Sequence, residues 1–198
     1  MQDTIFFDLG NVLLFFDHEK MCRQIAELTR LDINYITQTM ASRLDPYERG
    51  EITTQNIYRD FCLLADHPIA YDQVRLAISD IFKENLDSVE IVKELKAKGK
   101  KLYILSNTCE AHFDYAVQHF PFLQWFDGHI LSYRIGARKP EKTIFEKALT
   151  LARCNNNQCF YTDDMQENIK AATALAIDAE QFTTAERLRT HLHERNIL

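Results

Sequence analysis

The sequence predicts an α/β protein with a parallel sheet and an inserted block of helices. Short apolar segments of strand character alternate with helical segments in the second half of the chain, which is typical of βαβ crossovers. The first apolar segment, Ile5–Phe7, ends directly at Asp8 and a turn. Apolar residues at helical spacing dominate 17–85. We therefore expect a Rossmann-like core at 1–16 and 86–198, with a four-helix cap between them.

The composition fits one globular domain that carries an insertion. The 198 residues are 46% hydrophobic, the formal net charge is −6, and no Lys/Arg cluster stands out. Nucleic acid and anionic membranes are therefore not expected as partners, and Val12–Phe16 is too short to span a bilayer. The five cysteines are odd in number and form no CxxC pair, which favours reduced thiols and a cytoplasmic location. Monomer and homodimer both remain open.

Four helices are expected in the insertion. Asp17 can cap the first and Thr53 the third, and a second fits 32–44 before a turn at 45–50. Val74 to Phe82 marks the fourth.

The expected core elements alternate between helix and strand. In order they are a helix ending at Gly99, a strand at 101–105, a helix to about Phe120, a strand at 129–131, a helix with Pro140 in its first turn, a strand at 159–162, a helix through Ile169 and Ala172, a strand near Ile177, and a last helix through Leu188 and Leu192.

Polar side chains follow three of these strands. Asp8 follows the first, Ser106 follows the strand at 101–105, and Asp163 and Asp164 follow the strand at 159–162. Since the carboxyl ends of parallel strands share one edge of the sheet, we expect these groups to meet there, with Lys139 nearby. Taken singly, each piece reads more simply as a turn, a helix start or a solvated cap.

Together the same residues indicate phosphoryl chemistry. Carboxylates that converge on one cleft repel one another unless a cation lies among them, and an all-oxygen donor set suits Mg²⁺. A lysine and a hydroxyl supply charge neutralisation and a hydrogen bond to a phosphoryl group. A carboxylate can attack phosphorus and form an aspartyl-phosphate.

The motifs resemble those of the haloacid dehalogenase-like (HAD) superfamily with a helical cap of the C1 type. The matching stretches are IFFDLGNVL, LYILSNT, RIGARKP and FYTDDMQEN, and the likeness covers nearly the whole chain. The DLGN, YERGEIT and LSNT segments bring it nearest the α-D-glucose-1-phosphate phosphatase-like branch.

The resemblance implies a role for each matching residue. Asp8 is expected as the nucleophile, and Ser106, Asn107 and Lys139 as the groups that bind the phosphoryl oxygens. The expected Mg²⁺ ligands are Asp8, the Gly10 carbonyl and Asp164, with Asp163 as the partner of Asp164. Asn168 falls where the pattern has a further acid or amide. These roles predict a Mg²⁺-dependent phosphatase that acts on a small phosphorylated metabolite.

One position departs from the family pattern. Most phosphatases of this superfamily carry an Asp two positions after the nucleophile, where this chain has Gly10. General acid–base help is worth roughly 100- to 10,000-fold, so its loss favours good leaving groups such as the anomeric hydroxyl of a sugar. His18 and Asp17 lie shortly downstream as possible substitutes, although His18 also fits the start of a helix. Cys109, just after the LSNT segment, reads as a packing thiol.

Two other functions remain open. A 2-haloacid dehalogenase shares the fold and also lacks the second Asp, but it needs no metal and leaves Asp163 and Asp164 without a task. A catalytically weak protein that binds a phosphorylated ligand is the other alternative. Magnesium dependence and turnover of an activated aryl phosphate separate these possibilities.

Overall fold

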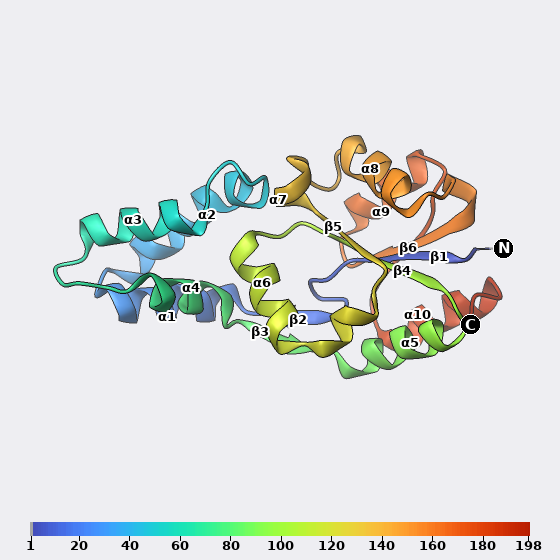
Figure 1. Cartoon of the computed structure of the whole chain (residues 1–198), viewed down its shortest axis with the longest axis horizontal. Helices are drawn as coiled ribbons and strands as arrows, with labels where there is room; N and C mark the ends of the chain where they lie inside the picture. The colour runs from blue at the N-terminus through green and yellow to red at the C-terminus, as the bar shows by residue number, and fades with distance from the viewer. Residues whose placement is uncertain (1) are drawn as a thin grey trace.

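The computed structural model describes residues 2–198 and has a five-stranded parallel sheet at its centre (Figure 1). The strand order is β5-β4-β1-β6-β7, and every neighbouring pair is parallel. The strands are β1 (Thr4–Phe7), β4 (Lys101–Ser106), β5 (Gly128–Leu131), β6 (Cys159–Asp163) and β7 (Asp178–Gln181). The sheet grows first to one side of β1 and then to the other, which opens a crevice at the carboxyl end of β1.

Helices cover both faces of this sheet, so the predicted α/β fold class is confirmed (Figure 1). Helices α5 (Leu86–Ala97), α6 (Glu110–His119) and α10 (Ala185–Glu194) share one hydrophobic cluster with the sheet, and α8 (Lys142–Ala152) and α9 (Gln166–Ala174) share the other. Successive residues of β1 point to opposite faces, so Phe7 joins the first cluster and Phe6 the second. Within residues 2–198, no helix is long and apolar enough to cross a membrane.

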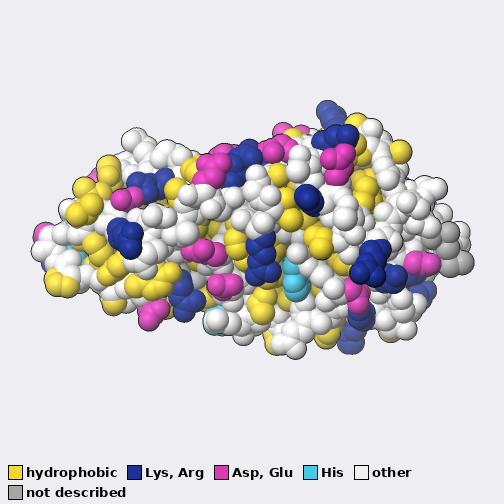
Figure 2. Space-filling view, turned by 45° about the horizontal axis from the view of Figure 1, so that its top comes forward, with side chains coloured by type: hydrophobic (Ala, Val, Ile, Leu, Met, Phe, Trp, Pro, Cys, Tyr) yellow, Lys and Arg dark blue, Asp and Glu magenta, His cyan; other side chains and the backbone are white. Residues whose placement is uncertain are grey.

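Four helices of the insertion lie together at one end of the molecule and are here called the cap helices (Figure 1). They are α1 (His18–Thr29), α2 (Ile33–Glu48), α3 (Thr54–Leu64) and α4 (Tyr71–Ser79). Asp17, Asp32 and Thr53 accept hydrogen bonds from the first turns of α1, α2 and α3. The buried faces of the four helices form a third cluster, which Cys109 and Ala111 of the core also join. Figure 2 shows hydrophobic side chains at the surface of this end of the molecule as well.

A two-stranded antiparallel sheet lies where the chain enters and leaves the four helices. Strand β2 (Leu14–Phe16) precedes the four helices in the sequence and strand β3 (Phe82–Glu84) follows them, and the two strands pair with each other. The sequence analysis placed Ile81 and Phe82 in the fourth helix, and this was wrong because α4 ends at Ser79. Three-residue strands give too short a pattern to distinguish from the end of a helix.

Two helix boundaries also differ from the prediction. Helix α2 continues to Glu48 through Pro46, where a turn was expected, because the buried Tyr47 packs inward and its hydroxyl lies 2.6 Å from Thr54 Oγ1. Helix α8 begins at Lys142, so Pro140 lies in the preceding turn. The short helices α7 (Ser132–Ile135), η1 (Pro121–Trp125) and η2 (Asn156–Gln158) were not expected.

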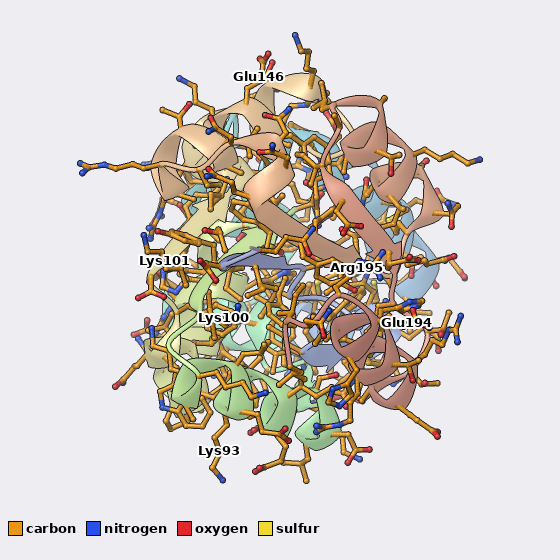
Figure 3. All side chains as sticks on the ribbon, turned by 90° about the vertical axis from the view of Figure 1, so that its right-hand side faces the viewer. Lys93, Lys100, Lys101, Glu146, Glu194 and Arg195 are labelled. Atoms are coloured by element: carbon orange, nitrogen blue, oxygen red, sulfur yellow. The ribbon has the colours of Figure 1, made fainter. Side chains whose placement is uncertain are left out.

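The end of the sheet away from the cap is held by charged contacts. Figure 3 faces this end and labels Lys100 at the start of β4 and Arg195 after α10. Lys100 Nζ lies 3.0 Å from Asp3 Oδ1, and Arg195 makes two contacts of 2.8 and 2.9 Å with the Asp178 carboxylate. These contacts fix both ends of the chain at the amino edge, and β1 runs from there toward the cap (Figure 1).

Candidate active site

The site begins where β1 and β6 end side by side. Phe7 is opposite Thr162, and the Asp8 amide donates to the Thr162 carbonyl at 3.0 Å. Asp163 is the last residue of β6, so the carboxylates of Asp8 and Asp163 leave the sheet at the same edge. Burial of Ile5–Phe7 in the core explains why the chain becomes polar only at Asp8.

Lys139 joins these two carboxylates. Its Nζ lies 2.8 Å from Asp8 Oδ1 and 2.6 Å from Asp163 Oδ2, and its side chain is only 1% exposed. The Asn107 side chain exchanges two hydrogen bonds with the Lys139 backbone, at 2.8 and 2.9 Å. Asn107 therefore helps to position the lysine, and its contact with the substrate stays a prediction.

Asp163 has a hydrogen-bond partner at each side-chain oxygen. Oδ2 accepts from Lys139 and from the Tyr161 hydroxyl. Oδ1 accepts from the Met165 amide at 2.8 Å and from Asn168 Nδ2 at 2.9 Å. With these four donors, Asp163 has little remaining capacity for a metal ion, and its place in the network is to hold Lys139.

Asp164 is held much less. Its Oδ2 accepts one hydrogen bond of 2.9 Å from Asn11 Nδ2, and no hydrogen bond within residues 2–198 reaches its Oδ1. Asp8 Oδ2 likewise accepts no hydrogen bond within residues 2–198, whereas Asp8 Oδ1 accepts from the Leu9 amide at 2.7 Å. One oxygen of Asp8 and one of Asp164 are therefore available to a ligand.

The donor set fits a divalent cation. Ligand atoms of Asp8, Asp163 and Asp164 all lie within 4.8 Å of one another, and with Lys139 the group carries a formal charge of −2. A divalent ion would cancel that charge, and an all-oxygen set suits Mg²⁺. Asp8 and Asp164 are the carboxylates with room for it.

The charges in this cluster depend strongly on one another. Burial raises the pKa of Asp8 to about 7, while Lys139 opposes the rise and the charge of Asp163 adds to it. Burial also acts against the charged forms of Lys139 and Asp163. Their mutual attraction prevails and raises the pKa of Lys139 while lowering that of Asp163. A cation beside Asp8 would keep it in the carboxylate form that a nucleophile needs.

The loop after β4 closes another side of the site. Ser106 is buried, and its hydroxyl donates to the Asn107 carbonyl at 3.3 Å. The Ser132 hydroxyl accepts from the Thr108 amide at 2.9 Å and donates to the Thr108 carbonyl at 3.0 Å. Ser132 therefore fixes the loop that carries Ser106, although the sequence analysis did not single it out.

A phenylalanine ring occupies the space beside Gly10. A Cβ added at Gly10 would lie 2.8 Å from Phe16 Cε1 and 3.3 Å from Cδ1, and the first of these distances is closer than two carbon atoms can approach. An aromatic ring therefore lies beside position 10, where the family pattern has a residue with a carboxylate. The His18 ring packs on Phe16, with centroids 4.7 Å apart.

Sequence reasoning missed the residues that act through others. Asn11 bonds Asp164, and the Phe16 ring lies against Gly10. Tyr161 bonds Asp163, and Ser132 bonds the backbone of Thr108. Two of them had a signal in the sequence: Asn11 lies in the turn after Asp8, and Tyr161 lies two residues before Asp163, on the same face of a strand. The contacts of Phe16 and Ser132 depend on the folded chain.

Comparisons with known proteins show that this fold is shared. A D-ribitol-5-phosphate phosphatase from Bacteroides thetaiotaomicron is 23% identical over an alignment that covers 91% of this chain and 92% of that relative. A HAD family enzyme from the same organism, crystallised with magnesium and inorganic phosphate, superposes with a TM-score of 0.78 at 23% identity and covers 91% of this chain and 94% of its own. L-2-haloacid dehalogenase from Xanthobacter autotrophicus gives a TM-score of 0.65 at 16% identity, over 100% of this chain and 85% of its own.

The family itself follows from a match to most of the chain. The family model described as haloacid dehalogenase-like hydrolase covers residues 2–175, which include β1, the cap, Lys139 and the Asp163–Asp164 pair. The chain therefore belongs to the haloacid dehalogenase-like hydrolases.

Proposed function

We propose that this hydrolase is a Mg²⁺-dependent phosphatase that acts on a small phosphorylated metabolite. The observation that carries the proposal is the buried Asp8–Lys139–Asp163 ion-pair network beside the less restrained Asp164. A dianionic phosphoryl group needs both a cation and a fixed lysine, and this edge of the sheet can supply them. The phosphatase from Bacteroides thetaiotaomicron supports the same reaction class.

Asp8 and Asp164, with the Gly10 carbonyl that the resemblance implies, would hold Mg²⁺. When bound, the ion supplies charge neutralisation to the phosphoryl oxygens. Lys139 adds a fixed positive charge, and Ser106 adds a hydroxyl at the end of β4. Asp163 keeps the lysine in place.

Asp8 attacks phosphorus through one of its carboxylate oxygens. A new O–P bond forms to Asp8 as the bond to the leaving oxygen breaks, and that oxygen departs with the electron pair. Water then attacks phosphorus, which releases inorganic phosphate and restores the Asp8 carboxylate. The leaving oxygen takes its proton from solvent, because Gly10 has no side chain to donate one.

This proton requirement limits the substrates that we propose. Anomeric, acyl and aryl phosphates release more stable anions than primary alkyl phosphates do, so a sugar phosphate of the anomeric kind is favoured over a polyol phosphate. We further propose that residues 17–85 act as the cap that covers the substrate, with 1–16 and 86–198 as the catalytic core.

The test is hydrolysis of 4-nitrophenyl phosphate with Mg²⁺ and with excess chelator. We expect turnover that needs the metal and that Asp8→Asn abolishes. Turnover that persists in chelator would overturn metal dependence, and halide release from 2-chloropropionate would then favour the dehalogenase alternative. Binding of phosphate without turnover of any ester would favour the non-catalytic alternative.

A further inference from the structure

A cavity of about 460 Å³, here named the cap cavity, lies between cap helices α1 and α2 and the start of α6. This volume suits a small organic molecule. Most of its lining is apolar or sulfur-containing, and the residues of this kind on the two cap helices are Met21, Cys22, Ile33, Met40, Ala41 and Leu44.

The cap cavity adjoins the catalytic groups at three places. Cys109, in its wall, comes three residues after Ser106. Glu48, also in the wall, has Oε2 2.6 Å from an Arg138 nitrogen, and Arg138 precedes Lys139. His18 packs on the Phe16 ring that covers Gly10. Asp8, Ser106 and Lys139 are not in the lining themselves, so the leaving group of a phosphate at Asp8 would have to extend along these three links to reach the cap cavity.

The charged side chains of the lining already have partners. Arg138 lies against Glu48 as an ion pair, and Arg23 lies 3.4 Å from Asp17 and 3.5 Å from Glu19. A ligand with a second phosphate or a carboxylate would have to compete with these pairs. The cap cavity therefore favours an uncharged group.

The hydroxyls of the lining are engaged as well. Tyr47 contacts Thr54 Oγ1 at 2.6 Å, and Thr37 donates to the Ile33 carbonyl at 2.8 Å. Within residues 2–198, His18, Asn34 and the Glu48 carboxylate, whose Oε2 accepts no hydrogen bond although it lies beside Arg138, are lining groups that can still bond a ligand hydroxyl. A polyol enclosed here would lose hydrogen bonds to water without replacing most of them, and that loss disfavours it.

We propose that the cap cavity binds an aromatic ring carried by the leaving group of the phosphate ester. The inference rests on the proposed phosphatase function and names its substrate class as aryl phosphates. Methionine and cysteine sulfur atoms pack favourably against aromatic rings, and Met21, Met40 and Cys22 supply them. Burial lowers the pKa values of His18 and His112, so both rings are neutral near pH 7 and add apolar surface.

The first measurement compares phenyl phosphate with 1-naphthyl phosphate, whose leaving groups have similar acidity but different ring area. We expect kcat/KM for the naphthyl ester to be about tenfold higher in the wild type, which is the size of discrimination that apolar pockets achieve. Ala41→Trp, at an exposed position of the lining, should reduce this ratio to near one. Ser42→Trp places the same ring one residue further along α2, outside the lining, and should leave the ratio unchanged.

A binding measurement keeps this inference separate from the proposed function. The dissociation constants of 1-naphthylmethylphosphonate and methylphosphonate, in Mg²⁺, require no turnover. We expect the naphthyl compound to bind about tenfold more tightly to the wild type and to Ser42→Trp, but not to Ala41→Trp. Equal affinities in the wild type, or a preference that survives Ala41→Trp, would overturn the aromatic site. Tight naphthyl binding without hydrolysis of any ester would instead contradict the phosphatase function.

Discussion

Gly10 and Phe16 together explain why the usual acid–base side chain is absent. The Phe16 ring fills the position that a Cβ at residue 10 would need, yet the residue is 37% exposed. Its outer edge therefore has room to move, at the cost of its contact with His18. The restriction on leaving groups that we propose would therefore depend on both Gly10 and Phe16.

This pairing predicts the outcome of restoring the acid. Gly10→Asp alone should gain little activity toward ethyl phosphate, because the new side chain meets the ring. Gly10→Asp with Phe16→Ala should exceed Phe16→Ala alone by roughly 100-fold or more, the usual worth of general acid–base help. The measurement is kcat/KM for the wild type, both single variants and the double variant.

4-Nitrophenyl phosphate is the control substrate, since its leaving group needs no proton and its kcat/KM should change little. A full gain from Gly10→Asp alone would show that Phe16 is no obstacle. Equal rates of the wild type on both esters would reveal another proton donor, and His18 would be the first residue to replace.

Asp163 and Asp164 are neighbours with different partners. Asp163 is fully buried and accepts a hydrogen bond from Lys139. Asp164 is partly exposed and accepts a hydrogen bond from Asn11. Asp163→Asn should lower the free energy of unfolding by about 3 kcal/mol, because it leaves a buried lysine with one carboxylate fewer. Asp164→Asn should change it by less than about 0.5 kcal/mol while abolishing Mg²⁺-dependent activity.

Urea unfolding of both variants, without metal, measures this difference. Equal destabilisation by the two substitutions would contradict the separate tasks. The sequence predicted that the two acids belong to the site, but their tasks depend on Tyr161, Asn168 and Lys139. The reach of those side chains cannot be read from a motif.

At the scale of elements, the cap and core meet through the end of α2. Arg138 lies 2.5 Å from Asp45 and 2.6 Å from Glu48, and Arg49 lies 2.6 Å from Glu141. Gly50, with φ of +73°, lies so close to α7 that a Cβ would collide with the Tyr133 carbonyl oxygen. These contacts explain why α2 extends past Pro46, a feature that local propensity argues against.

Helix α6 contacts the cap through a histidine that resists protonation. His112 Nε2 lies 3.2 Å from the Ile78 carbonyl of α4. Burial, together with the smaller effect of the charge of His18, lowers the pKa of His112 to about 4. Since the unfolded chain takes up this proton near pH 6.5, stability is complete above that pH and decreases as the pH falls toward 4.

The expected loss is up to about 1.4 kcal/mol per pH unit within that window. His112→Gln keeps a donor for the Ile78 carbonyl and cannot titrate, so its unfolding free energy should depend less on pH. Urea unfolding of both proteins at pH 7, 6 and 5 measures the difference in slope. Identical slopes would mean that another group controls the acid sensitivity, with His18 as the next candidate.

At the scale of the whole molecule, the parallel sheet was predictable from the sequence. Strands β1, β4, β5 and β6 each contain a short apolar segment, while β7 (Asp178–Gln181) is mostly polar and follows the apolar Ile177. Strands that alternate with helices in this way admit few arrangements. The pairing of β2 with β3 was missed because each strand has only three residues and the whole insertion separates them in the sequence. The division at residues 17 and 85 stays a prediction, since it concerns how the two parts move and fold.

Metal binding should stabilise the whole chain through the charge of one site. Without a cation, Asp8, Asp163, Asp164 and Lys139 leave a formal charge of −2 at the end of β1. An ion that binds only the folded state adds about 2.7 kcal/mol at 100 times its dissociation constant. For a chain of this size we expect Tm to rise by roughly 5 to 10 °C.

Calorimetry in Mg²⁺ and in excess chelator, at equal ionic strength, measures this rise. Asp164→Asn should remove the shift, because it takes away the carboxylate with most room for the ion, yet it should leave Tm in chelator near that of the wild type. The Asp8–Lys139–Asp163 network persists in that variant and keeps the core folded. A shift of the same size in Asp164→Asn would place the bound ion elsewhere on the chain.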